Sequence, residues 1–142
     1  VLTFFFIIFC TAMVNAKKSC GDFSDIVEKE TCTEPWKNMR GVLHPAQQAV
    51  GYAAVKRKLD SGFGTKDNAK ESMNSEEVPI VIGPGGLPFL VDSHHTIRAL
   101  EESGFDSVDV TFKKICDWSD MNDATFFDSM IQSNLMDPLG RH

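Results

Sequence analysis

The sequence VPIVIGPGGLPFLVDSHHTIRALEESG, at residues 78–104, predicts a β-hairpin followed by a helix. Two short apolar runs, residues 79–82 and 88–91, flank a turn that is rich in glycine and proline. Asp92 or Ser93 is placed to cap the helix, and Gly104 is placed to end it. A strand leading into a capped helix puts unpaired N–H groups and the positive end of the helix dipole at one point, which favours an anion.

Four side chains suited to acid–base or phosphate chemistry occur near the start of this helix. They are Asp92, His94, His95 and Arg98. Such a density of titratable groups is typical of functional sites. An ordinary capped helix with solvated histidines is the competing interpretation, and the pattern by itself does not name a reaction.

The first sixteen residues contain four phenylalanines and no charged side chain. Their end, Val14-Asn15-Ala16, is typical of a signal-peptidase site, so residues 1–16 are interpreted as a secretory signal and Lys17 as the start of the mature chain. The signal lacks an initiator Met and a basic segment, so it is interpreted as incomplete. It is shorter than the roughly 20 residues of a membrane span, and no membrane association is expected after its removal. A buried N-terminal strand is the alternative.

The net negative charge of the chain comes from its last third. The formal net charge is −6, and residues 17–100 carry 11 acidic and 11 basic groups, so the imbalance comes from residues 101–142. A large nucleic-acid surface needs clustered lysine and arginine, and this composition opposes one, although a local basic groove remains compatible with it. The mature length is that of a single domain.

The cysteines are interpreted as structural. Cys20 and Cys32 lie close together in a polar segment and are expected to form a disulfide in an oxidising compartment, which agrees with a secreted, extracellular protein. Cys116 ends an apolar run and is interpreted as a buried thiol. No histidine is spaced beside a cysteine as a zinc site or a Cys–His pair would require.

The remaining elements are predicted from periodicity and turn residues. A helix is expected from Pro45, in its first turn, to Leu59, and the polar residues 61–77 are expected to form a loop. Alternation over residues 107–116 predicts a strand, and Asn122 or Asp123 is placed to cap a last helix. The turn-like ending favours a chain truncated at its C-terminus.

Two separated motifs give the chain a resemblance to a known family. Leu43-His44-Pro45-Ala46-Gln47 followed by Val50-Gly51, and then Val91-Asp92-Ser93-His94-His95, resemble the two signatures of the ParB-like nuclease family. The resemblance covers roughly residues 39–140 and implies a small α+β domain of the ParB and sulfiredoxin superfamily, with a mixed sheet and packed helices, at residues 42–142. Residues 17–41 are then an N-terminal extension that holds the disulfide.

The resemblance also implies a phosphate-recognising or nucleotide-recognising site where the strand meets the helix. Two departures from the family pattern limit what the resemblance implies about the chemistry of the site. Ala46 stands where the family usually has threonine, which removes a hydroxyl, and Ser93-His94 lacks the cysteine of sulfiredoxin, which argues against redox repair.

Phosphoryl chemistry of the nuclease or phosphohydrolase type is the first functional hypothesis. His94 or His95 acts as general base or acid, because imidazole titrates near neutral pH, while Asp92 orients an imidazole or holds a divalent cation. Arg98 and Ser93 at the helix start, with Gln47 and His44 from the neighbouring motif, are the expected contacts to a phosphate-bearing nucleotide or nucleic acid. Adjacent histidines on a helix point about 100° apart, which argues against one metal bound by both.

Two alternatives come from other functional classes. The chain is either a non-catalytic module that binds phosphate or nucleotide, or a secreted protein that binds a partner and keeps the motif for folding alone. Replacing His94 and His95 with glutamine separates catalysis from binding, and a monomer without affinity for phosphate or nucleotide favours the partner-binding hypothesis.

Overall fold

The computed structural model describes residues 17–47 and 49–136. They form an α+β fold with one mixed five-stranded sheet, as the sequence predicts. The strands are β1 (Thr31–Pro35), β2 (His44–Pro45), β3 (Glu77–Ile82), β4 (Pro88–Leu90) and β5 (Asp109–Asp117). The helices are α1 (Trp36–Met39), α2 (Tyr52–Gly62), α3 (Lys66–Asn74), α4 (His94–Ser103) and α5 (Asp123–Gln132), with a short 3-10 turn, η1, at Pro84–Gly86.

The sheet has the strand order β1-β5-β3-β4-β2. β3 and β4 are antiparallel and joined by η1, which confirms the predicted hairpin. β5 runs parallel to β3 and antiparallel to β1, and β2 runs parallel to β4. β3 and β5 therefore form the centre of the sheet, where Val78, Ile80 and Phe112 are completely buried.

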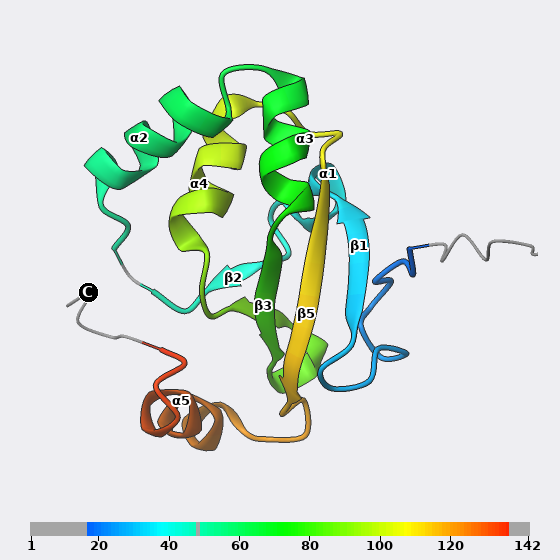
Figure 1. The fold of residues 1–142 in the computed structure, drawn as a ribbon. Helices are drawn as coiled ribbons and strands as arrows, with labels where there is room; N and C mark the ends of the chain where they lie inside the picture. Colours follow the sequence, from blue (N-terminus) through cyan, green and yellow to red (C-terminus); the bar gives the residue numbers. More distant parts are fainter. Residues whose placement is uncertain (1–16, 48, 137–142) are drawn as a thin grey trace, which may run out of the picture.

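The helices gather at two ends of the sheet. α2, α3 and α4 lie together at the end where β3 and β5 begin, and α5 lies beyond the other end (Figure 1). This arrangement gives two apolar clusters. The larger packs residues of the sheet against α2, α3 and α4 and also includes Cys20, Phe23 and Ile26 of the N-terminal segment. The smaller packs Phe126 and Met130 of α5 against Phe89 of β4.

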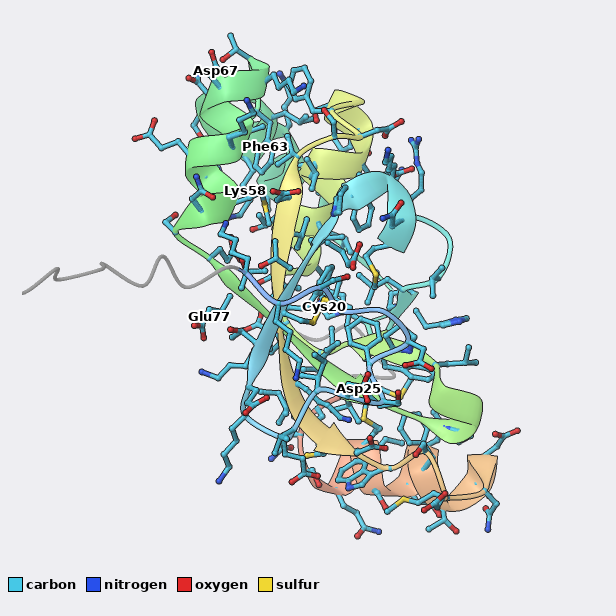
Figure 2. The ribbon with its side chains drawn as sticks, turned by 90° about the vertical axis from the view of Figure 1, so that its right-hand side faces the viewer. Cys20, Asp25, Lys58, Phe63, Asp67 and Glu77 are labelled. Carbon is cyan, nitrogen blue, oxygen red and sulfur yellow. A yellow bond between two sulfur atoms is a disulfide. The ribbon has the colours of Figure 1, made fainter. Side chains whose placement is uncertain are left out.

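The N-terminal segment is fixed to the side of the sheet. The predicted disulfide between Cys20 and Cys32 is present and joins the segment to β1. Figure 2 shows this segment, with Cys20 labelled, lying over β1. The buried Glu34 carboxylate accepts hydrogen bonds from the Ser19 hydroxyl and from the Cys20 N–H, and these bonds lower its pKa.

The helix predicted to begin at Pro45 begins instead at Tyr52, so that prediction is wrong. His44 and Pro45 form β2, which pairs with Phe89 and Leu90 of β4. The N–H of Ala46 continues this pairing by donating to the Leu90 carbonyl at 2.9 Å. Pairing with a distant strand therefore outweighs the local preference of proline for the first turn of a helix.

The loop predicted for residues 61–77 is also wrong, because it contains α3. Thr65 caps this helix by accepting from the Asn68 N–H at 3.2 Å. Ala69 and Met73, four residues apart, are buried on its inner face. Two apolar side chains on one face are enough to dock a short helix whose other residues are polar.

The later predictions agree better with the structure. β5, at Asp109–Asp117, agrees with the strand expected over residues 107–116 except at its ends, and Asn122 caps α5 by accepting from the Thr125 N–H at 3.0 Å. The predicted signal at residues 1–16 and the turn-like ending at residues 137–142 lie outside the described residues. In the part of the chain that the structure describes, none of the helices has the length and apolarity to span a membrane.

Candidate functional site

The β4–α4 connection places the two histidines at the start of a helix. Ser93 is the residue before the helix and adopts a left-handed conformation with φ 63°. Its side chain makes no capping hydrogen bond, and Asp92 Oδ1 accepts from the Ser93 N–H at 2.6 Å. The predicted capping by Asp92 or Ser93 of a helical N–H is therefore wrong, while Gly104 ends α4 as predicted, with φ 73°.

The His94 side chain combines burial with an unused nitrogen. It is 7% exposed, and Nε2 has no hydrogen-bond partner within the described residues. Burial lowers the pKa of His94 below its usual 6.5, and this effect outweighs the opposing influence of the Leu90 backbone and the Asp92 carboxylate. His94 is therefore a neutral imidazole near pH 7.

Two cavities have His94 in their linings. We call the first the Asp92 cavity, because Asp92 is the acidic residue in its wall. It has a volume of about 520 Å³. Its lining consists of Gln47, Pro79, Val91, Asp92, His94, His95, Ile115, Asn134 and Leu135.

The second cavity lies between helices α2 and α4, and we call it the α2–α4 cavity. It has a volume of about 450 Å³. Its apolar lining comes from Trp36, Leu43, Pro45, Val50, Tyr52, Val55, Leu90 and Ile97. Its polar lining comes from Gln47, His94, Arg98, Glu101 and Glu102. Both volumes are in the range of small-molecule sites.

The two sequence motifs come together at these cavities. Gln47 of the first motif and His94 of the second line both of them. Gly51 lies next to His95, because a Cβ atom on the glycine would be at an ordinary contact distance of 3.9 Å from Nε2. Segments more than 40 residues apart in the sequence thus share one site.

Arg98 lines the α2–α4 cavity and pairs with an acidic neighbour. Its Nε lies 2.8 Å from Glu102 Oε1. This pairing uses one of the five N–H donors of the guanidinium, which leaves four for a ligand. Arg98 can therefore contact a phosphate, although Glu102 offsets its charge.

His44 lies apart from the other predicted residues. It stacks on Phe89, with ring centroids 5.2 Å apart and an interplanar angle of 29°, and it lines neither cavity. Ser93 lies between Asp92 and His94 but also lines neither cavity. The predicted contacts of His44 and Ser93 to a substrate thus have no support from cavity geometry.

No group of three or more His, Cys, Asp or Glu side chains is placed to hold a metal ion within residues 17–47 and 49–136. Asp92 is exposed at the edge of its cavity, and its role as a ligand for a divalent cation stays a prediction. A cation held by Asp92 and one histidine would need further ligands from the substrate or water.

Sequence reasoning missed several residues of the cavity walls, among them Tyr52, Asn134 and Trp36. Asn134 belongs to no motif, and Tyr52 follows the Val50-Gly51 pair without being part of it. Their positions depend on where α2 begins and where the chain turns after α5. Trp36 lines the α2–α4 cavity as well as covering the core. The closeness of Tyr52, the only tyrosine of the chain, to the Val50-Gly51 motif is the one signal that could have found it.

Comparison with known proteins places this geometry in a family. The fold is similar to the crystal structure of protein Atu1540 from Agrobacterium tumefaciens, with a TM-score of 0.56 and 23% identity. The match covers 77% of this chain and 50% of that one, and at this identity it concerns the fold alone. No protein of curated function matches the chain in sequence. The model of the family described as "Putative ParB-like nuclease" matches residues 39–142, which is most of the chain, and the protein therefore belongs to this ParB-like family.

Proposed function

We propose that this chain hydrolyses phosphate esters, with His94 as the general base. The observation that carries the proposal is the buried, neutral His94 imidazole. Its Nε2 has no partner among the described residues, and His94 as a residue lines both cavities. A neutral imidazole that faces a cavity can accept a proton from water. Membership of a ParB-like nuclease family supports the same class of chemistry.

The neighbouring side chains supply the other parts of such a reaction. His94 Nε2 takes a proton from water, the water oxygen bonds to phosphorus, and the bond from phosphorus to the ester oxygen breaks. His95 gives the leaving oxygen its proton, and both histidines then exchange protons with solvent. Gln47 positions the phosphate between the cavities, and the free N–H donors of Arg98 stabilise its charge.

The charge of the site favours a small substrate or a nucleic-acid end over a long duplex. Asp92, Glu101 and Glu102 line the cavities, whereas Arg98 is the one lysine or arginine in these linings among the described residues. A duplex binds through many phosphate contacts to basic side chains. The proposed substrate is therefore a nucleotide or another ester with few phosphates.

The test measures hydrolysis and binding in the same variants. Bis(p-nitrophenyl) phosphate and nucleotides are assayed with the full chain, in the presence and absence of Mg²⁺, Mn²⁺ and Zn²⁺. His94→Gln and His95→Gln should each lower the rate by about 100-fold or more, the scale of general acid–base catalysis. His44→Gln is the matched control, because His44 lines neither cavity, and it should keep the rate.

Binding is followed by the shift in melting temperature with each ligand, since a ligand of the folded state raises it. Loss of turnover with retained binding in the His94 variant supports the proposal. A parent chain that shows no turnover under any of these conditions overturns it.

A non-catalytic phosphate-binding module is the second candidate. It is favoured by the pairing of Arg98 with Glu102 and by the Asp92 carboxylate, which together leave little positive charge to stabilise a phosphoryl transition state. Binding without turnover would select this candidate. A chain that binds neither phosphate nor nucleotide would instead favour a protein partner.

We also propose that the protein is secreted. The Cys20–Cys32 disulfide and the uncharged, apolar residues 1–16 support export. Expression of the chain with a Met and a basic segment added before residue 1 should release into the medium a protein that begins at Lys17 and contains this disulfide. N-terminal sequencing and mass measurement without reductant test both features, and a chain that stays in the cell with residues 1–16 attached contradicts the proposal.

A further inference from the structure

We propose that the α2–α4 cavity is a subsite for an aromatic ring, or a similar planar apolar group, that the phosphate ester carries. The position of the phosphate beside His94 rests on the proposed function. The ring subsite rests on the cavity itself, and its test can succeed or fail separately.

The floor of this cavity is apolar and closely packed. Val55, Leu90 and Ile97 contribute to the lining and are only 2%, 3% and 6% exposed. They come from a helix, a strand and a second helix, so the floor is held by the core of the domain. A volume of about 450 Å³ above such a floor fits a ring-sized group.

One aromatic wall is fixed by a hydrogen-bond network. Trp36 Nε1 donates to Glu101 Oε2 at 2.8 Å, and Arg40 Nε donates to Glu101 Oε1 at 3.0 Å. Arg40 also pairs with Asp106 at 3.0 Å. The indole is therefore held in place before any ligand arrives, which lowers the ordering cost of binding.

A second aromatic side chain stands at the rim. Tyr52 is 73% exposed although it lines the cavity, and it begins α2 directly after Gly51. Scattered exposed apolar residues are normal, so exposure alone means little. Here the exposed ring adjoins an apolar cavity that already has a fixed indole in its wall. A planar ligand group would cover part of Tyr52 and gain an aromatic contact.

The aromatic side chains of the lining decide which part of the ligand enters. Trp36 and Tyr52 line the α2–α4 cavity and not the Asp92 cavity, so a ring gains contacts with the indole and the phenol only in the α2–α4 cavity. Each of the two linings has one more carboxylate than it has lysine or arginine side chains, so charge does not favour either cavity for the phosphate. Because Gln47 and His94 line both cavities, a ring in the α2–α4 cavity leaves its attached phosphate beside the two histidines.

Phenyl phosphate and methyl phosphate test this subsite, because they differ in the ring alone. Phenyl phosphate should bind about tenfold more tightly. In NMR of the full chain, saturation of the phenyl protons should transfer to the methyl groups of Val55 and Ile97. Tyr52→Ala should weaken phenyl phosphate binding about fivefold and leave methyl phosphate unchanged, whereas Tyr52→Phe should keep both affinities.

Val27→Ala is the remote control, since Val27 is 63% exposed and lines neither cavity. Equal affinity for the two phosphates, absence of phenyl phosphate binding, or phenyl contacts that miss Val55 and Ile97 would each overturn the subsite. Methyl phosphate hydrolysis without ring contacts would keep the proposed function and reject the subsite. Ring contacts without hydrolysis of either ester would support the subsite and reject the proposed function.

Discussion

At the scale of single residues, the burial of His94 has a measurable effect on stability. Its pKa is lowered in the folded protein by burial, while in the unfolded chain it returns to about 6.5. The unfolded state therefore binds more protons as the pH falls below about 6.5, and folding is weakened there. Above that pH His94 is neutral in both states and contributes no pH dependence.

This difference predicts how a variant responds to acid. The free energy of unfolding of the parent chain should fall between pH 7 and pH 5, and part of that fall should be absent from His94→Gln. Urea unfolding of the parent chain and the His94 variant at both pH values measures it. Identical slopes in the parent chain and the His94 variant would contradict the burial of a neutral imidazole.

A residue of the hairpin turn predicts a second effect. A Cβ atom on Gly83 would lie 2.7 Å from ring atoms of both Phe89 and Phe126, closer than atoms pack. Gly83→Ala should therefore lower the free energy of unfolding by about 1–3 kcal/mol, as overpacking does. Gly64→Ala is the matched control, because a Cβ there meets nothing within 4 Å. Urea unfolding that gave equal losses for the two variants would contradict the close packing of α5.

At the scale of elements, the end of α4 depends on a backbone conformation that glycine adopts freely. Gly104 has φ 73°, and a Cβ there meets no atom within 4 Å. Gly104→Ala should cost about 1 kcal/mol through backbone strain alone. Gly104→Asn should cost less, because asparagine tolerates the left-handed region. Thermal unfolding of the two variants measures the difference, and an alanine variant as stable as the parent would contradict it.

The elements that could be predicted from the sequence are those with local signals. The hairpin has its glycine-rich turn, α4 has Gly104, and α5 has Asn122. α3 has a local cap at Thr65, but its apolar face consists of Ala69 and Met73 alone, which is too short a pattern to indicate a helix. The start of α2 was missed for another reason. Local sequence favours a helix at Pro45, and the pairing that overrides it comes from β4, more than 40 residues away.

The same limit applies to the candidate site. The cluster of Asp92, His94, His95 and Arg98 is visible in the sequence because its members are neighbours. The position of Gln47 beside His94 came from the family resemblance, since no periodicity links the two residues. Tyr52 and Asn134 reach the cavities through tertiary packing, and this is why the sequence alone did not identify them.

At the scale of the whole molecule, the disulfide determines how firmly residues 17–30 are held. Cys20 and Cys32 are 12 residues apart, and closing a loop of this size contributes about 3 kcal/mol to stability. Replacing both cysteines with serine should lower the free energy of unfolding by about this amount. The same loss should occur in the parent chain with excess dithiothreitol, and Cys116→Ser is the control that keeps the bridge. Unchanged stability after reduction would contradict the predicted contribution of the disulfide.

The His94 imidazole belongs to the walls of both cavities, so its titration can report which cavity is occupied. A ring settling on the apolar side removes water and makes the protonated form still less favourable. A phosphate on the opposite side attracts that proton and shifts the titration the other way. A single NMR titration of the His94 ring protons therefore distinguishes the two occupants by the direction of the shift.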